Sequence, residues 1–575
     1  MPRERTDPPL SPPIERPPCN IVMKGGITSG VVYPLTVVEL SKKYRFAGIG
    51  GTSAGAIAAS LTAAAELGRA SGGFDKLSAV AADLPKIMRS LFQPSPRYRR
   101  LFELLMGLAP ERSAWRKAVR VVAGSSVAYP VPFALGILPA LVLVAAGWLL
   151  RSPALAFVAA PLALALFLPL ALALRVHRFL TRELPRSDFG LCPGVRQPWA
   201  MSDGLIDWLA DLLDDVAGLP RGVDGRPVKP LTFGDLNGPD PAHPVIDLQM
   251  FTTCLSTGRP HVMPTDLNVF LFDPAEMRAL FPERIVRWMV DHSKSFEGDP
   301  RLRYLPSREH LPVVVPVRMS LSFPFLFPTV PLWMRDRTLT DPAQQAKPRR
   351  LRFADGGMCS NLPLQLFDHL WPLCPTFAVA LDPFSPDRHR AADGTDVRVK
   401  LQSRSRAGIL LPVVPIDTLG AFIGSMLGTM QNWQDHLQAT LPGYRERMIR
   451  VRLKDDEGGM NLDMDPVVIA HLGDLGRQAG IALATEFDWP AHRWIRAISA
   501  LDRLSGALTA LDADTIAFIR ARNALSPPNA QTKAWQTGAV AAMDALVAWR
   551  AANTASLAPP KPPRPLPQMR MMPRP

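Results

Sequence analysis

The chain has 575 residues and a formal net charge of +14, since 65 Lys and Arg residues outnumber 51 Asp and Glu residues. Apolar residues make up 47% of the chain and charged residues 20%, which excludes an intrinsically disordered protein, because such chains are poor in apolar residues. The five cysteines are scattered without a CxxC spacing. This excludes a disulfide framework and a clustered zinc site, and it favours a reducing compartment.

The N-terminal part of the chain alternates between strand and helix patterns. Residues 1–18 are rich in proline and lack the apolar core of a signal peptide, so we expect a disordered arm. A strand over 19–24 and a glycine-rich turn precede a helix over 31–40. A second strand over 46–50 precedes an alanine-rich helix over 54–67. Strands that alternate with helices are typical of a parallel α/β sheet.

Two apolar stretches without a charged residue follow, over 121–150 and 152–174. Each exceeds the roughly 20 apolar residues that a membrane-spanning helix needs, and the short turn between them would fold them into a hairpin. Basic residues outnumber acidic ones on both flanks, over 97–120 and 175–186, which marks the cytoplasmic side of a membrane and favours an anionic lipid surface. We therefore expect a membrane hairpin over 121–174, with the rest of the chain on the cytoplasmic side.

Other interpretations of this block stay open, because prolines interrupt both stretches. A helical hairpin buried in a soluble protein, a dimer interface or a re-entrant loop would have the same composition. Membrane helices tolerate proline better than soluble ones do, so a spanning hairpin remains our expectation.

Strand patterns return after this block. Apolar, β-branched runs predict strands over residues 245–255, 268–272, 313–322, 351–353 and 376–382. The sequence thus predicts one sheet that a long insertion divides.

The last third of the chain carries fewer signals. Residues 384–557 have the pattern of amphipathic helices, with a strand signal only near 448–453. Residues 558–575 are basic and rich in proline, so we expect a disordered tail. We therefore expect an α/β domain over 19–383, followed by a helical C-terminal region.

The segment Gly51–Gly55 has the sequence Gly-Thr-Ser-Ala-Gly and lies between the second strand and the alanine-rich helix. This is the setting of a G-x-S-x-G nucleophile elbow, which holds a serine in strained backbone geometry. A Cβ atom at Gly51 or Gly55 would crowd such a turn. Ser53 would lie at a helix N-terminus, whose free N–H groups favour developing negative charge. An ordinary tight turn would have the same pattern.

A second glycine-rich segment, Lys24–Gly30, ends the preceding strand. Consecutive glycines allow backbone N–H groups to approach an anion closely, so the amides of Gly25, Gly26 and Ile27 could form an oxyanion hole. The segment lacks the second glycine of a G-x-G-x-x-G fingerprint and the terminal Gly-Lys-Ser/Thr of a P-loop, which argues against nucleotide binding.

A third segment, Asp355-Gly356-Gly357, follows the strand over 351–353. A serine hydroxyl is a poor nucleophile and needs a base within hydrogen-bond reach. A carboxylate at a strand end can supply that base. An Asp-Gly-Gly segment by itself is more typical of a turn.

Together and in this order, the three segments resemble those of the patatin-like phospholipases. The sequences at 251–264 and 319–332 resemble further parts of that family, and the resemblance covers residues 19–85 and 245–383. It implies a three-layer α/β/α fold. It also implies a serine acyl hydrolase that cleaves fatty-acyl esters of membrane lipids through an acyl-enzyme, without a cofactor or a metal.

The resemblance further implies that Ser53 is the nucleophile and Asp355 its general base, a Ser–Asp dyad, with the oxyanion bound by amides of the glycine-rich turn. That turn departs from the family pattern, because Ile27 stands where a third glycine is usual and Ser29 where a basic residue is usual. A backbone oxyanion hole does not depend on these side chains. The missing basic residue removes one expected contact with a lipid head group or with the turn.

Two other functions fit parts of the sequence, and a third is disfavoured. An α/β-hydrolase with a Ser–His–Asp triad would use His369 or His389, although neither lies in a motif. A non-catalytic membrane scaffold with a degenerate patatin fold would fit the altered turn. Nucleic-acid binding is disfavoured despite the net charge, because aromatic residues are only 7% of the chain and no nucleic-acid motif occurs.

Overall fold

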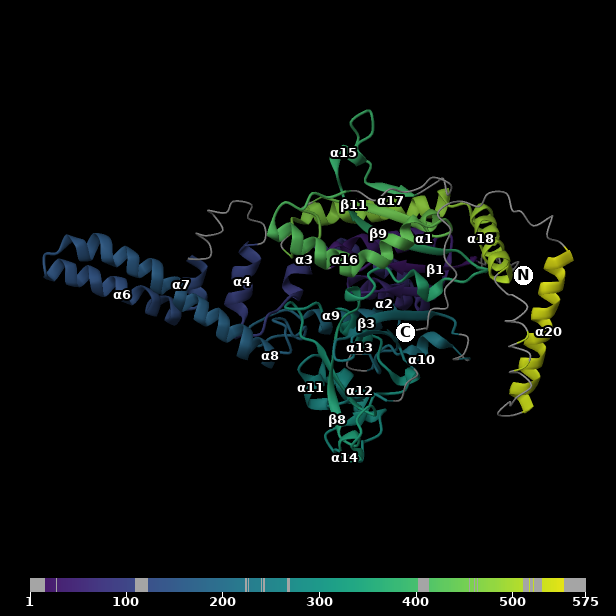
Figure 1. Ribbon diagram of the computed structural model, residues 1–575, viewed down its shortest axis with the longest axis horizontal. Coiled ribbons are helices and arrows are strands. Elements are labelled where there is room, and N and C mark those ends of the chain that lie inside the picture. The colour runs from purple at the N-terminus through teal and green to yellow at the C-terminus, as the bar shows by residue number, and fades with distance from the viewer. Residues whose placement is uncertain are drawn as a thin grey trace, which may run out of the picture.

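Figure 1 shows the protein as a computed structural model. It describes residues 16–26, 28–108, 123–222, 225, 227–238, 240, 244–265, 269–401, 413–454, 456–459, 461–462, 464–509, 517, 521 and 530–552. Several expectations fall wholly or partly outside the described residues. They are Ile27 of the oxyanion hole, the tail over 558–575, all but the last three residues of the arm over 1–18, the first two residues of the hairpin over 121–174, the first residue of the strand over 268–272, and parts of the C-terminal region over 384–557.

A mixed sheet of 11 strands forms the centre of the molecule. In chain order these strands are β1 (Pro18–Met23), β2 (Arg45–Gly51), β3 (Asp247–Cys254), β4 (Arg259–Met263), β5 (Leu271–Phe272), β6 (Arg303–Tyr304), β7 (Val330–Arg335), β8 (Pro348–Asp355), β9 (Thr376–Pro383), β10 (Val399–Leu401) and β11 (Met448–Leu453). Across the sheet they lie in the order β10-β11-β9-β1-β2-β3-β8-β7-β5-β6, and β4 pairs with β3. The neighbours from β11 to β3 pair in parallel, as the strand–helix alternation predicts, whereas β8 and the strands beyond it pair antiparallel.

Helices cover both faces of this sheet (Figure 1). In chain order they are α1 (Tyr33–Ser41), α2 (Ala54–Leu67), α3 (Gly73–Leu91), α4 (Arg99–Leu108), α6 (Pro130–Leu149), α7 (Ala160–Arg178), α8 (Leu184–Arg186), α9 (Leu205–Val216), α10 (Phe233–Asn237), α11 (Pro274–Arg278), α12 (Glu283–Asp291), α13 (Val314–Ser320), α14 (Pro342–Gln345), α15 (Pro386–His389), α16 (Leu419–Thr440), α17 (Pro466–Glu486), α18 (Trp489–Thr509) and α20 (Ala530–Ala552). The main core lies between the sheet and α1, α2, α3 and α17.

Strand β1 shows how the two faces are divided, because successive side chains of a strand point to opposite faces. Ile21 and Met23 belong to the main core, whereas Val22 packs on the other face with Leu364 and Phe367. The expected fold class is confirmed: an α/β/α core carries an inserted apolar hairpin and a helical C-terminal region.

The register of three strands places the predicted segments together. Met23 of β1 pairs with Gly51 of β2, so the turns that follow these parallel strands lie side by side. Gly51 also pairs with Met250 of β3, and Thr252 of β3 pairs with Asp355 of β8. The motifs on which the patatin-like resemblance rests therefore meet at one edge of the sheet.

One predicted strand, over 313–322, is wrong. Its central residues form the helix α13, and all seven of them are buried. A continuous apolar run that is buried on every side has no periodicity, so it does not distinguish a buried strand from a buried helix. Pro316 lies in the first turn of α13, where its missing N–H removes no helical hydrogen bond.

The sheet also extends past the boundary expected at residue 383. Both β10 and β11 come from the region 384–557, and β11 pairs in parallel with β9. Helix α17 of the same region packs closely on the segment before α1, because a Cβ atom at Gly476 would lie 1.9 Å from the carbonyl oxygen of Val32. The C-terminal region is mainly helical, and it is part of the α/β core rather than an addition to it.

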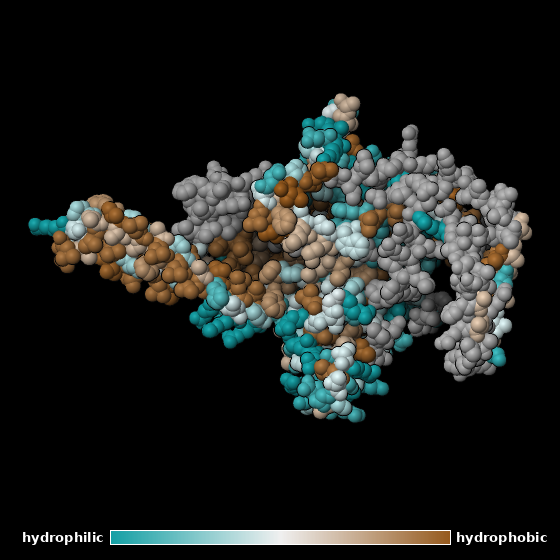
Figure 2. Space-filling model, in the orientation of Figure 1, coloured by the Kyte–Doolittle hydropathy of each residue, from teal (hydrophilic) through white to brown (hydrophobic). Residues whose placement is uncertain are grey.

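Two long apolar helices project from the core as a hairpin (Figure 1). They are Pro130–Leu149 and Leu155–Arg186, and only 17% and 6% of their most apolar windows are buried. Figure 2 shows the apolar surface that they leave uncovered. A helix of 20 residues is about 30 Å long, the thickness of the hydrocarbon core of a bilayer. The hairpin is not packed inside this chain, which excludes the buried-hairpin alternative.

Two helical glycines test the packing of the C-terminal region. Gly476→Ala should lower the free energy of unfolding by about 2 kcal/mol, because the new methyl group would overlap a backbone carbonyl. Gly424→Ala in α16 is the matched control, since nothing lies within 4 Å of its Cβ position, and it should raise that free energy by about 0.5–1 kcal/mol. Urea denaturation measures both, and equal effects would contradict the packing of α17.

Candidate active site

Ser53 occupies a strained turn between β2 and α2. Its backbone has φ 54° and ψ −130°, a region that residues other than glycine rarely adopt. A Cβ atom at Gly51 would lie 2.2 Å from the carbonyl oxygen of Gly55, and one at Gly55 would lie 2.3 Å from that of Met23. The two glycines are therefore required for α2 to begin this close to β1 and β2, which is the geometry of a nucleophile elbow.

Asp355 ends β8 and is 3% exposed. Its backbone N–H donates to the carbonyl oxygen of Ser322 at 3.0 Å, and its Oδ1 accepts from the N–H of Gly357 at 2.7 Å. A Cβ atom at Gly356 would lie 2.0 Å from the carbonyl oxygen of Phe251, so a side chain there would displace the turn. The Asp-Gly-Gly segment thus holds the carboxyl group in a fixed, buried position.

Burial raises the pKa of Asp355 to about 7, against the interaction with the Ser53 hydroxyl and the Gly357 amide, which both lower it. Oδ2 is buried and accepts no hydrogen bond of standard geometry from the described residues. The contact with Ser53 is therefore looser than a full hydrogen bond, as is common for catalytic pairs without substrate. A carboxylate with a pKa near 7 can both accept and return a proton at neutral pH.

The glycine-rich turn differs from the expected set of three amide donors. The N–H of Gly25 donates to the carbonyl oxygen of Asn361 at 2.9 Å, so it holds the turn in place and is not free to bind an oxyanion. The N–H of Gly26 donates to none of the described residues, and Ile27 lies outside them. A Cβ atom at Gly25 would lie 2.2 Å from Asn361 Oδ1, 3.1 Å from Ser53 Cβ and 3.2 Å from the carbonyl oxygen of Thr52, so a side chain there would displace Asn361 and crowd Ser53.

Two polar residues of the site have no motif of their own in the sequence. Ser320 Oγ accepts a hydrogen bond from the backbone N–H of Ser53 at 3.0 Å. The carbonyl oxygen of Asn361 accepts from Gly25 and from Thr52 Oγ1. Both lie in segments that resemble the patatin-like family, which was the only sequence signal for them.

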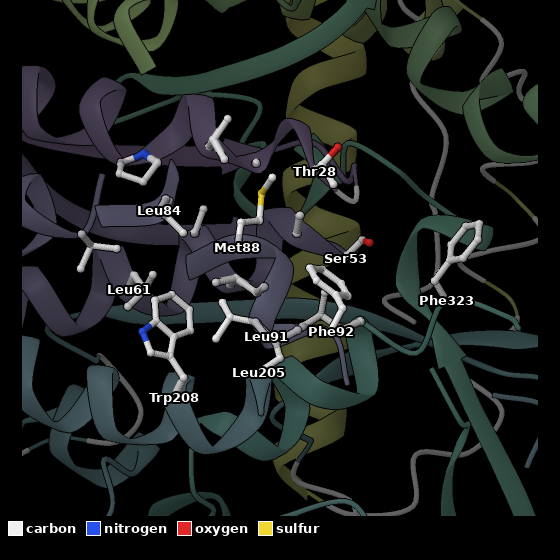
Figure 3. A pocket seen from close by; sticks show the side chains of 18 of the residues that line it. Thr28, Ser53, Leu61, Leu84, Met88, Leu91, Phe92, Leu205, Trp208 and Phe323 are labelled. Atoms are coloured by element: carbon white, nitrogen blue, oxygen red, sulfur yellow. The ribbon is translucent and has the colours of Figure 1, made fainter. Parts of the chain in front are cut away.

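An apolar cavity begins beside Ser53 and extends along α2 between α1, α3 and α9. Figure 3 shows Ser53 and Thr28 at one end, and Leu61 and Trp208 toward the other. The residues that α2 contributes are spaced as one helical face, as are those of α3. Its lining is Thr28, Gly30, Val31, Pro34, Ser53, Ala54, Ile57, Ala58, Leu61, Val80, Leu84, Met88, Leu91, Phe92, Leu205, Trp208, Leu321, Phe323, Leu326 and Phe327.

Neither histidine of the alternative triad lies at this site. His369 is exposed, and its carbonyl oxygen accepts a hydrogen bond from Arg496. His389 Nδ1 accepts from the backbone N–H of Ser385 at 3.0 Å, at the end of α15. Among the described residues neither contacts Ser53 or Asp355, and no group of three or more His, Cys, Asp and Glu side chains could hold a metal ion.

Comparison with known proteins finds a relative that matches most of the chain. The RpoH suppressor of Rhizobium meliloti (strain 1021) is 35% identical over 576 residues, which cover 86% of this chain and 87% of that protein. The crystal structure of VipD from Legionella pneumophila is similar over 93% of this chain and 88% of that chain, with 12% identity and a TM-score of 0.31. A likeness this remote supports no functional inference. No protein-family model matches the sequence.

The raised pKa of Asp355 predicts how stability depends on pH. The unfolded chain loses this proton near the ordinary pKa of 3.8 and the folded protein near 7, so stability falls as the pH rises between these values. Asp355→Asn should therefore raise the free energy of unfolding at pH 8 by a few kcal/mol, at about 1.4 kcal/mol per pKa unit, and the gain should shrink toward pH 4.

Asp382 gives a control of opposite sign. Burial would raise its pKa, but Lys24 and Arg450 outweigh burial and hold the pKa below its ordinary value. Its ion pairs stabilise the fold above the unfolded pKa and lose that effect as the pH falls through the folded pKa, so Asp382→Asn should destabilise the protein at pH 8. Chemical denaturation at the two pH values measures both variants. A loss of stability in Asp355→Asn at pH 8 would contradict the claim that the buried, ionised carboxylate of Asp355 destabilises the folded protein at that pH.

Proposed function

The chain belongs to the same family as the RpoH suppressor of Rhizobium meliloti, and we propose that it is a serine acyl hydrolase that cleaves fatty-acyl esters of membrane lipids. One observation carries the proposal. Ser53, in a strained turn at a helix N-terminus, adjoins a buried carboxylate with a pKa near 7 at one end of an apolar cavity. This combination supplies a nucleophile, its base and a site for an alkyl chain.

The proposed reaction has two acyl-transfer steps. Asp355 accepts the proton of the Ser53 hydroxyl as Oγ attacks the ester carbonyl carbon, and it returns that proton to the leaving alcohol. An acyl-enzyme on Ser53 results. Asp355 then accepts a proton from water as the water oxygen attacks the acyl-enzyme, and it returns that proton to Ser53 Oγ as the fatty acid leaves.

The oxyanion of each tetrahedral intermediate needs preorganised donors. The N–H of Gly26, which donates to none of the described residues, and the first N–H groups of α2, beginning at Ala54, are the donors beside Ser53 that the arrangement supports. The positive end of the α2 dipole adds to their effect. Gly25 acts indirectly, by fixing the turn to Asn361.

The cavity favours an acyl chain as the group that Ser53 receives. It follows α2 from Ser53 to Leu61, eight residues or about 12 Å of helix. An extended alkyl chain zigzags, so each bond of about 1.5 Å advances the chain by only about 1.25 Å, and roughly ten carbons would fill that length. Its lining is apolar apart from Thr28 and Ser53, so a charged head group would remain outside.

Ser53→Ala and Asp355→Asn should each lower the rate of fatty-acid release from phospholipid by several orders of magnitude, since a nucleophile and its base act as a unit. Mass spectrometry of the lipids released by purified protein measures this rate. A fluorophosphonate probe should label Ser53 in the wild type.

His369→Ala and His389→Ala are the controls and should keep wild-type activity. Loss of activity in either would favour the Ser–His–Asp alternative. Folded protein that the probe does not label would favour the non-catalytic scaffold.

We infer that the hairpin inserts into a membrane and holds the catalytic domain on its cytoplasmic side. The length and exposure of its two helices support this, and so do the arginines at its base. Arg97, Arg175 and Arg178 pair there with the buried Glu183, and their excess positive charge favours the cytoplasmic face and anionic lipid.

Carbonate extraction tests this insertion. The wild type should stay with the membrane pellet. A Leu141→Asp, Leu166→Asp variant should move to the supernatant, because both leucines are exposed on the hairpin and each charge near a helix centre costs about 3 kcal/mol in a bilayer. Release of the wild-type protein by carbonate would rule out integral insertion.

A further inference from the structure

Backbone strain is concentrated where the hairpin joins the site. Among the described residues, five that are not glycine have a positive φ, and one of them, Arg151, lies at the turn of the hairpin. The other four are Ser53, Asp188, Phe189 and Phe325. Such residues cluster at functional sites and persist only where the surrounding structure holds them. Three of them follow the hairpin or contact the segment that does.

Hydrogen bonds join Phe325 to the segment that leaves the hairpin. Its N–H donates to the carbonyl oxygen of Phe189 at 2.9 Å, and its own carbonyl oxygen accepts from the N–H of Leu191 at 3.1 Å. Asp188 is fixed in turn, because its two carboxylate oxygens accept from Arg350 of β8 at 2.6 and 2.7 Å. We call the segment over 188–191, which leaves the hairpin, the hairpin root. It therefore adjoins both β8, which ends at Asp355, and the loop that carries Phe325.

The loop over 321–327 also forms a wall of the cavity. Leu321, Phe323, Leu326 and Phe327 line the cavity, whereas the side chain of Phe325 is 60% exposed. A large aromatic ring is thus held outside by a strained backbone, while four other residues of the loop line the cavity. The interior of the cavity and the surface at the hairpin root are separated by one loop.

The segment that precedes the hairpin in the chain packs against the same wall of the cavity. The ring of Phe92 packs on Phe327 with 5.9 Å between centroids, and the N–H of Ser95 donates to the carbonyl oxygen of Leu191. Beyond it, Arg99 lies over the ring of Trp199 at 4.4 Å. An exposed aromatic residue beside arginines is the pattern of a protein surface at the boundary between lipid and water.

We propose that Phe325 and the hairpin root form the surface through which the acyl chain of an anionic bilayer phospholipid passes into the cavity beside Ser53. This rests on the proposed acyl hydrolase function. The arginines at the root complement an anionic head group. The Phe325 ring partitions into the acyl region of the bilayer, and the chain follows the loop over 321–327 inward. The lipid is then drawn directly from the membrane that holds the hairpin.

Phe325→Gly tests this surface with little risk to the fold, because glycine adopts a φ of +67° without strain. Fatty-acid release is measured from phosphatidylglycerol-containing vesicles and compared with hydrolysis of the soluble ester p-nitrophenyl butyrate. The ratio of the vesicle rate to the soluble rate should fall about tenfold, since a buried Phe side chain contributes that much or more to partitioning. Leu373→Gly, at a residue 96% exposed, is the control and should leave the ratio unchanged.

An unchanged ratio in Phe325→Gly would overturn the proposal, whether both rates stay the same or both fall equally. A fall of the ratio in Leu373→Gly as large as that in Phe325→Gly would also overturn it. A second readout does not need catalysis. In Ser53→Ala protein, a phosphatidylglycerol with a photoreactive acyl chain should crosslink to the loop over 321–327. Crosslinking without hydrolysis by the wild type would refute the proposed hydrolase alone, whereas absence of the crosslink would refute the lipid path alone.

Discussion

The site depends on one close approach of backbones, that of Gly55 to the end of β1. Because no Cβ atom fits between Gly55 and the carbonyl oxygen of Met23, α2 begins directly against the paired ends of β1 and β2. The chain between strand and helix has only Thr52 and Ser53 to make this turn, and Ser53 takes up the strain. The same contact places the glycine-rich turn beside the serine, so the positions of the proposed nucleophile and of the proposed oxyanion donors are set together.

The carboxyl group that faces Ser53 is held by a different part of the chain. Asp355 is fixed by the loop at Ser322, whose Oγ accepts from the guanidinium of Arg318 at 2.7 Å. Arg318 is fully buried, and burial lowers its pKa to about 9. Its other donors reach the carbonyl oxygens of Pro193 and Pro328. One buried cation therefore ties the segment after the hairpin to the loop that holds Asp355.

The C-terminal region completes the site from the other side. Polar residues spaced three apart on α16 bind the segment that follows Asp355, and so they hold the Asn361 carbonyl that accepts from Gly25. These residues are Asn432, Asp435 and Gln438, which bind Asn361, the Leu362 amide and Gln365. Removing this helix would free the loop on which the glycine-rich turn rests. The sequence pattern of α16 shows amphipathic spacing but not the partner of its polar face.

The sequence by itself determined the features that depend on neighbouring residues. The strand–turn–helix units over residues 19–67 and the turns at Ser53 and Asp355 follow from glycine sterics and from the period of apolar residues, which act within a few positions of the chain. The length and apolar character of the hairpin are local in the same way. The tertiary structure alone decided that 313–322 is a helix, that β10 and β11 join the sheet and that Gly25 donates to Asn361. Each of these depends on which strands become neighbours and on what surrounds a buried run, and contacts between residues hundreds of positions apart leave no local pattern.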